Sequence, residues 1–204
     1  MERLVSLAGE VVAEHPAVTR VELTGSRARG THEELSDWDF AVETSNFAAV
    51  ARDLPTLIAP LHPLAEQWEP LGRFPVYQVM LCGPTKIEYL FLEYAQGPAP
   101  PVNPSKDTLS AINTHFWDWI WWLATKEAAG RHDLVIEHLP QLFRHLLQPM
   151  GVDKGPEDLQ GATQAFLARR NALELQCGTS VSRTLENEIR RGIHRLKQTA
   201  QHHR

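Results

Sequence analysis

Hydrophobic residues recur at two different spacings along the chain, and the spacing changes near residue 96. Before that point, short runs rich in β-branched and aromatic residues alternate with stretches whose apolar residues lie three or four positions apart. After it, the helical spacing continues almost to the C-terminus. Alternating strands and helices predict an α/β or α+β arrangement, and consecutive helices with short connections predict a bundle.

The first part is expected to form two helices and four strands. Apolar residues at positions 4, 7, 8, 11 and 12 mark one face of a helix that ends before Pro16. Asn46 is a suitable N-cap for a second helix, which runs to about Leu57. β-rich runs predict strands at residues 18–24, 38–42, 75–81 and 86–92, and a hairpin-like turn at 82–85 joins the last two.

A proline-rich stretch separates the two parts. Residues 96–105, QGPAPPVNPS, contain four prolines and no aliphatic run, which is typical of a linker. We therefore expect a first domain at residues 1–95, a linker at 96–105 and a helical domain at 106–204. The helices of the second domain are predicted at about 107–130, 131–147, 156–175 and 180–201.

Composition narrows the class of protein. With 204 residues and 43% hydrophobic residues, the chain can fill a core without disulfides. Its two cysteines, Cys82 and Cys177, are far apart, which favours a reducing, cytoplasmic setting. The N-terminal segment is acidic where a signal peptide is basic, and no stretch approaches the roughly 20 apolar residues that a membrane span needs. We therefore expect neither a membrane protein nor a secreted one.

The net charge of −5 is unevenly distributed. Residues 1–95 hold 7 Lys and Arg against 14 Asp and Glu, whereas residues 96–204 hold 13 against 11. An acidic first domain repels the phosphates of nucleic acids, so a basic groove for DNA or RNA is disfavoured.

The segment TGSRARGTHEELSDWDF, residues 24–40, carries the strongest chemical signal. Gly25 lets the backbone approach a ligand closely, and the following N–H groups and the Ser26 hydroxyl can bind phosphate oxygens. Asp37 and Asp39 would share one face of a strand, with their Cα atoms about 6.7 Å apart. Such a pair of carboxylates favours a hard divalent cation, Mg²⁺ or Mn²⁺.

A third carboxylate lies in a later strand. Glu88 stands inside the apolar run Ile87 to Phe91. An ionised glutamate in such a run is costly unless it is paired, hydrogen-bonded or bound to a metal. It is therefore the candidate that completes the set with Asp37 and Asp39.

These motifs together resemble the signature of the nucleotidyltransferase superfamily typified by DNA polymerase β. Gly25 and Ser26 precede Asp37 and Asp39 by ten intervening residues, and Glu88 follows. The GSRARG and SDWDF segments, followed by a helical half, are most similar to the aminoglycoside nucleotidyltransferase branch and related small bacterial enzymes. The resemblance implies a polymerase-β-like α/β (α+β) domain with a mixed sheet, followed by an all-α helical bundle.

The resemblance also implies an activity and its residues. Two divalent ions, Mg²⁺ or Mn²⁺, would be held by Asp37, Asp39 and Glu88, with Glu88 acting either as a ligand or as the base for the acceptor hydroxyl. Gly25 and Ser26 would bind the triphosphate of ATP or another nucleotide. A nucleoside monophosphate would then pass to an acceptor hydroxyl in a cleft between the two domains.

Several basic and polar residues have both a functional and a structural interpretation. Arg29, and less so Arg27, could bind phosphate or pair with nearby glutamates. Ser36 could cap or orient Asp37, and it is also a candidate nucleotide-binding residue. Lys126 ends a helical stripe that packs in the core or faces the cleft, where the lysine would reach phosphates. The remaining members of this stripe are His115, Trp119 and Trp122, and Asp118 on another face is a weaker candidate for acceptor binding.

The acceptor is predicted only by class. An acidic domain suits a small, hydroxylated and cationic molecule, such as an aminoglycoside-like compound. Two alternatives stay open: a protein-adenylylating nucleotidyltransferase of a toxin-antitoxin type, and a catalytically silent nucleotide-binding or regulatory module. A homodimer is also compatible with the resemblance.

Overall fold

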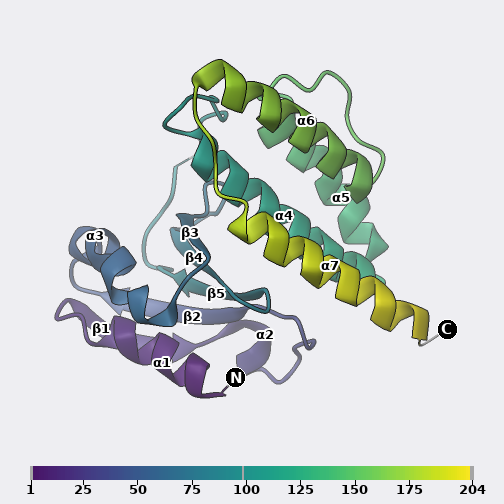
Figure 1. The fold of residues 1–204 in the computed structure, drawn as a ribbon. Coiled ribbons are helices and arrows are strands. Elements are labelled where there is room, and N and C mark those ends of the chain that lie inside the picture. The colour runs from purple at the N-terminus through teal and green to yellow at the C-terminus, as the bar shows by residue number, and fades with distance from the viewer. Residues whose placement is uncertain (1, 98, 203–204) are drawn as a thin grey trace. The chain divides into compact units, whose positions relative to one another are not determined.

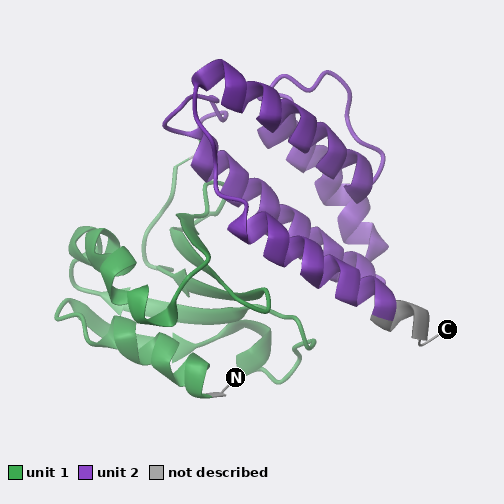
Figure 2. Cartoon of the chain, in the orientation of Figure 1, with its two compact units in different colours: residues 1–99 green, residues 100–204 purple. Residues whose placement is uncertain are grey.

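The computed structural model describes residues 2–97 and 99–202, and the chain divides into two compact units, residues 1–99 and 100–204 (Figure 2). The predicted linker includes position 98, and the predicted domains include positions 1, 203 and 204, which lie outside the described residues.

The first unit is built around a five-stranded mixed sheet of strand order β1-β2-β5-β4-β3 (Figure 1). Strands β2 and β5 run parallel, and the other neighbours are antiparallel. The predicted mixed sheet is thus confirmed. The elements of this unit are α1 (Glu2–Ala13), β1 (Val18–Leu23), α2 (Gly25–Ala28), β2 (Trp38–Thr44), α3 (Phe47–Leu57), the 3₁₀ turn η1 (Ala59–Leu61), β3 (Ala65–Trp68), β4 (Val76–Leu81) and β5 (Thr85–Leu90).

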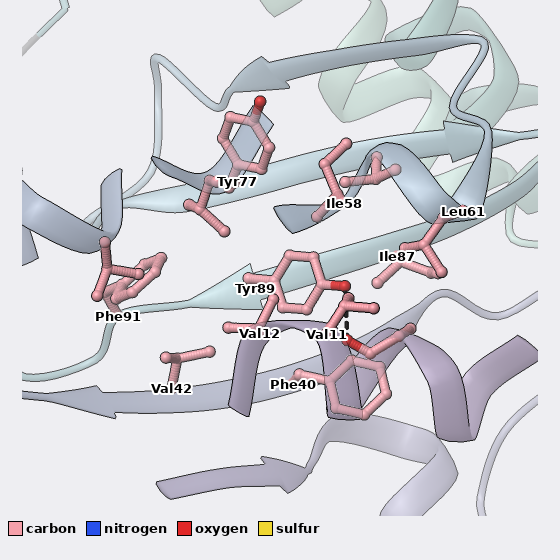
Figure 3. Close-up of a cluster of buried hydrophobic side chains, with 14 of the residues drawn as sticks. Val11, Val12, Phe40, Val42, Ile58, Leu61, Tyr77, Ile87, Tyr89 and Phe91 are labelled. Carbon is pink, nitrogen blue, oxygen red and sulfur yellow. Dashed lines mark hydrogen bonds between the residues drawn. The ribbon is translucent and has the colours of Figure 1, made fainter. Parts of the chain in front are cut away.

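One face of the sheet forms the hydrophobic core of this unit. Figure 3 shows side chains of α1 against alternate residues of β2 and β5. The Tyr89 hydroxyl donates a hydrogen bond of 2.8 Å to the carbonyl of Ala8, which ties β5 to α1. Since side chains alternate along a strand, the residues between these core positions lie on the opposite face. The buried core residues of the strands are Phe40, Val42, Tyr77, Val79, Leu81, Ile87 and Tyr89.

Two short elements differ from the sequence pattern. Strand β3 has the sequence AEQW, half-buried at every position, so no hydrophobic alternation marks it. It is held as an edge strand by its ladder with β4 and by a 2.9 Å hydrogen bond from Gln67 to Gln78. Helix α2 occupies the stretch that we expected to be a phosphate-binding loop. Asn46 caps α3 as predicted, because its side chain accepts from the N–H of Ala49 at 3.1 Å.

The second unit is helical throughout the described residues, as the pattern predicts. Its helices are α4 (Leu109–Ala128), α5 (His132–Leu142), a π-helical turn η2 (Phe143–Leu147), α6 (Leu159–Cys177) and α7 (Thr184–His202). The single helix expected at 131–147 is α-helical to Leu142 and continues as a π turn, in which the N–H of Gln148 donates to the Phe143 carbonyl at 2.8 Å. Among the described residues, no helix is long and apolar enough to cross a membrane.

The interior of the second unit is aromatic with one buried charge pair. The rings of Phe116 and Phe166 stack at 3.7 Å between centroids. Beside them, Arg170 is 3% exposed and pairs with Glu186 at 2.5 Å. Helices α4, α6 and α7 are therefore joined by packing and by a buried ion pair.

Candidate active site

The face of the sheet opposite the α1 core carries an acidic cluster. In the parallel pairing of β2 and β5, Asp39 is the direct partner of Glu88, and Trp38 is the partner of Ile87. Asp37 directly precedes β2, and the Lys86 ammonium contacts both Asp37 and Glu88, so Asp37 also lies at this cluster. The structure thus brings together the three carboxylates that the sequence singled out.

A buried lysine connects two of these carboxylates. The Lys86 ammonium lies 3.3 Å from Asp37 Oδ2 and 3.0 Å from Glu88 Oε1, and its side chain is only 5% exposed. Gln78 on β4 donates a hydrogen bond of 3.0 Å to the same Glu88 oxygen. Glu88 is 17% exposed and Asp37 24%, so the cluster is partly shielded from water.

The turn after β1 is fitted closely to Asp39. Gly25 has a φ of +65°, and a Cβ at this position would lie 1.8 Å from Asp39 Oδ2. The backbone is fixed at the same point, because the N–H of Thr24 donates to the Asp39 carbonyl at 2.7 Å. Gly25 is therefore required both for its positive φ and for the space that the carboxylate occupies.

The pKa values of the neighbouring carboxylates Asp39 and Glu88 shift in opposite directions. Burial raises the pKa of Asp39, and the charge of Glu88 raises it further, against the opposing influence of Lys86, Arg29 and Arg27. Burial also acts to raise the pKa of Glu88, but the charge and hydrogen bond of Lys86, with hydrogen bonds to Gln78 and Asp39, outweigh it and the pKa falls below its usual value.

The basic residues after Gly25 have different environments. The Arg27 guanidinium stacks 3.9 Å from the centre of the Trp38 ring and donates to the carbonyls of Ser36 and Glu34 at 2.8–3.0 Å. It thus ties the loop before β2 to α2. Arg29 is exposed, and its charge acts on Asp39.

Two hydroxyl-bearing residues were also predicted to bind nucleotide. Ser26 is half-buried in α2, where its carbonyl accepts from the N–H of Thr31 at 3.0 Å. The Ser36 hydroxyl accepts from the N–H of Glu33 at 2.9 Å, so it caps the turn before Asp37. Nucleotide binding by Gly25, Ser26 and Ser36 stays a prediction.

The remaining candidates lie on α4 in the second unit. His115 and Trp119 are each 8% exposed, with ring centroids 5.4 Å apart, and Asp118 is 4% exposed. Trp122 contacts the His138 ring, and the Lys126 ammonium lies 5.7 Å from the Trp122 ring centre. These contacts agree with the packing interpretation of the stripe, and a phosphate contact by Lys126 stays a prediction.

The donor set of the cluster fits a hard divalent cation. All three candidate ligands are carboxylates in one cluster, and burial, followed by the negative charge of Glu88, raises the pKa of Asp39. A divalent cation would remove that repulsion, and oxygen donors of this kind suit Mg²⁺ or Mn²⁺. Asp37, Asp39 and Glu88 are therefore the residues that would hold it.

Lys86 and Gln78 belong to the site although the sequence motifs do not include them. Lys86 stands two residues before Glu88 in a β-rich run, so strand alternation alone places both on one face. Gln78 needs the register between β4 and β5, in which it is the direct partner of Glu88. The predicted hairpin already joins these two strands, and the observed pairing of Leu81 with Thr85 at its turn sets this register.

Comparison with known proteins gives a family match within the first unit. Residues 4–83 match the family described as nucleotidyltransferase domain. None of the curated proteins matches significantly. Among solved structures, the polymerase core of TRAMP, an RNA surveillance complex, is similar with 13% identity and a TM-score of 0.37 over 57% of this chain. The chain spans 35% of the length of that structure.

A second solved structure is similar over most of the chain. It is an aminoglycoside 6-adenyltransferase from Bacillus subtilis, with 11% identity and a TM-score of 0.38, and the alignment covers 95% of this chain and 97% of that one. The family match holds Gly25, Ser26, Asp37 and Asp39 and ends before Glu88. Residues 4–83 of this chain are therefore similar to the nucleotidyltransferase domain family, which its motifs also resemble.

Proposed function

We propose that the protein is a metal-dependent nucleotidyltransferase that transfers a nucleoside monophosphate, AMP from ATP in the first instance, to a hydroxyl of a small acceptor. The observation that carries the proposal is the parallel register that places Asp39 beside Glu88, with Asp37 on the same face. It occurs in a chain whose residues 4–83 match a nucleotidyltransferase domain.

Each residue of the cluster has a proposed role. Asp37, Asp39 and Glu88 would hold Mg²⁺ or Mn²⁺, and the resemblance implies two ions. When bound, the metal supplies charge neutralisation for the triphosphate and for the departing pyrophosphate. Gly25 and Ser26 bind the triphosphate through backbone N–H groups and the hydroxyl, which leaves the phosphates close to the carboxylates.

The environment of Glu88 supports ligation over base catalysis. Its lowered pKa keeps it ionised at neutral pH, and a carboxylate with a low pKa is a weak general base. Two groups, Lys86 and Gln78, also fix its orientation.

The acidity of the first domain supports a cationic acceptor. Residues 1–95 have 7 more acidic than basic side chains, and three of the acids form the proposed metal site. Glu33 and Glu34 are exposed in the loop before Asp37 and can attract ammonium groups. We therefore propose a polyhydroxylated amine, such as an aminoglycoside-like compound, as the acceptor class.

The test is a pyrophosphate-release screen of the full chain with Mg²⁺, each nucleoside triphosphate and a panel of polyhydroxylated amines. Transfer of the monophosphate to one amine, seen as a mass increase of the acceptor, is the expected result. The Asp39→Asn variant serves as the control and should release no pyrophosphate.

Other outcomes assign the alternatives. Label from the α-phosphate that appears on a protein favours a protein-adenylylating enzyme. Calorimetric binding of ATP with Mg²⁺ but no pyrophosphate release with any acceptor favours a nucleotide-binding module. Equal release by the wild type and the Asp39→Asn variant contradicts the proposed mechanism.

A further inference from the structure

Lys86 belongs to a four-membered ladder of charges on the face of β2 and β5 opposite the α1 core. Asp39 faces Glu88 across the two strands. Two residues earlier in each segment lie Asp37 and Lys86, and the Lys86 ammonium is 3.3 Å from Asp37. Within β5, the same ammonium lies 3.0 Å from Glu88. One lysine thus contacts two of the three carboxylates proposed to bind metal.

The position of this lysine is unusual for its residue type. Lysine is almost never fully buried unless it is paired, and Lys86 is only 5% exposed. The neutral residues around it cannot balance its charge: its cross-strand partner is Met80, and Gln78 beside it is already bound to Glu88 and Gln67. Asp37 and Glu88, at 3.3 and 3.0 Å, supply negative charge that stabilises the buried ammonium.

The three carboxylates in turn need a positive charge beside them. Without a cation, Asp37, Asp39 and Glu88 would place up to three negative charges on one partly shielded face. Lys86 supplies one positive charge in contact with two of them. A divalent cation bound to the same oxygens would meet this ammonium at close range, and the two cations would repel each other.

We propose that Lys86 is the resident cation of the candidate site: its ammonium neutralises Asp37 and Glu88 in the metal-free protein and competes with a divalent ion for them. This inference rests on the proposed function, because it assigns the same carboxylates to metal. A consequence is that a divalent ion alone binds weakly, and that it binds well when a triphosphate brings additional negative charge.

The test is a titration of the full-length protein with Mn²⁺ alone, in which the electron paramagnetic resonance signal of free Mn²⁺ measures binding. Lys86→Met and Lys86→Gln remove the charge. A charge at such distances changes the proton affinity of a carboxylate by about 10- to 1,000-fold, so Mn²⁺ should bind both variants at least about tenfold more tightly than the wild type. Unchanged or weaker Mn²⁺ binding in both variants overturns the inference.

Two matched variants exclude other causes of tighter binding. Lys154→Met removes a lysine that is 86% exposed and changes the net charge equally, and it should leave the Mn²⁺ affinity as in the wild type. Gln78→Met removes the neutral hydrogen bond to Glu88 without changing any charge, and it should not tighten binding either. A loss of packing alone would weaken a metal site, so tighter binding is not a structural side effect.

Thermal melting tests the inference even if the Lys86→Met and Lys86→Gln variants fold poorly. Mg²⁺ should raise the melting temperature of Lys86→Met far more than that of the wild type, because the ion then replaces the missing charge. No difference in this response would contradict the inference. Since no triphosphate or acceptor is present, the result is independent of pyrophosphate release, and a failure of the proposed function is seen separately in the activity screen.

Discussion

The missing side chain of Gly25 provides the space for the Asp39 carboxylate: a Cβ on Gly25 would lie 1.8 Å from Asp39 Oδ2. Gly25 follows strand β1 and Asp39 lies on strand β2, and the two strands are also joined by the hydrogen bond from Thr24 to the Asp39 carbonyl. Gly25 therefore leaves space for the Asp39 carboxylate directly, in addition to its proposed role in binding phosphate.

Gly25→Ala should displace Asp39 and abolish nucleotidyl transfer. We expect a loss of about 1 kcal/mol from the positive φ and roughly 1–3 kcal/mol more from the collision. Gly30→Ala is the matched control, because Gly30 has a φ of +68° and a Cβ added there would meet no atom within 4 Å. Urea unfolding and pyrophosphate release measure both variants. Equal effects of the two substitutions would show that the collision is absent.

Asp39→Asn should stabilise the metal-free protein while it abolishes transfer. The pKa of Asp39 is raised by burial and by Glu88, so ionisation costs folding free energy above that pKa, and the cost disappears below about pH 3.8. The variant should therefore gain stability over the wild type as the pH rises. Because Asp39 is partly exposed, solvent screening keeps the gain small, on the order of 0.5 kcal/mol at pH 7.

Thermal melts with a chelator from pH 4 to pH 8 measure this difference. Asp53→Asn is a control of opposite sign, because the hydrogen bond from Arg52 lowers the pKa of Asp53. That variant should lose stability relative to the wild type as the pH rises towards and above about 3.8. A stability loss of Asp39→Asn at neutral pH would mean that the Asp39 charge is favourable in the fold.

Local sequence pattern predicts some parts of the site and not others. Asp37 precedes the predicted strand that contains Asp39, and Gly25 follows the β-branched run that predicts the first strand. The contacts of Arg27 with the loop carbonyls depend on the conformation of an irregular turn, and the pairing of Gln78 with Glu88 depends on the exact length of the hairpin turn between β4 and β5. The spacing of hydrophobic residues predicts neither, because both depend on contacts between separate segments. Strand β3 was not predicted for the same reason, since its pairing with β4 defines it.

Arg170→Met should destabilise the helical unit by about 3 kcal/mol, because it leaves the buried Glu186 carboxylate with weaker partners. Arg170 is 3% exposed and also donates to Asn113 at 3.1 Å. Arg190, at 3.1 Å from Glu186, is more exposed and can compensate only in part. Urea unfolding measures the loss. A change below about 0.5 kcal/mol would show that the pair contributes as little as a surface salt bridge does.

The pair of Glu174 and Arg183 should make the stability of the helical unit fall in acid. The hydrogen bond from Arg183, 2.6 Å long, lowers the pKa of Glu174 against the effect of burial, with a further bond from the N–H of Val181. A lowered pKa in the folded state means that the stabilisation is complete above the unfolded value, near pH 4.5, and is lost as the pH falls through the folded value. Glu174→Gln should therefore cost about 1 kcal/mol at pH 7 and nothing below the folded pKa.

Melting temperatures of wild type and variant between pH 7 and pH 3 measure this convergence. Glu157→Gln is the matched control, because its partner Lys154 lies 3.4 Å away with side chains 86% and 87% exposed. An exposed pair of this kind contributes little, so its curve should follow that of the wild type at every pH. If the curve of Glu174→Gln stays parallel to the wild type down to pH 3, the ion pair with Arg183 does not carry the acid sensitivity.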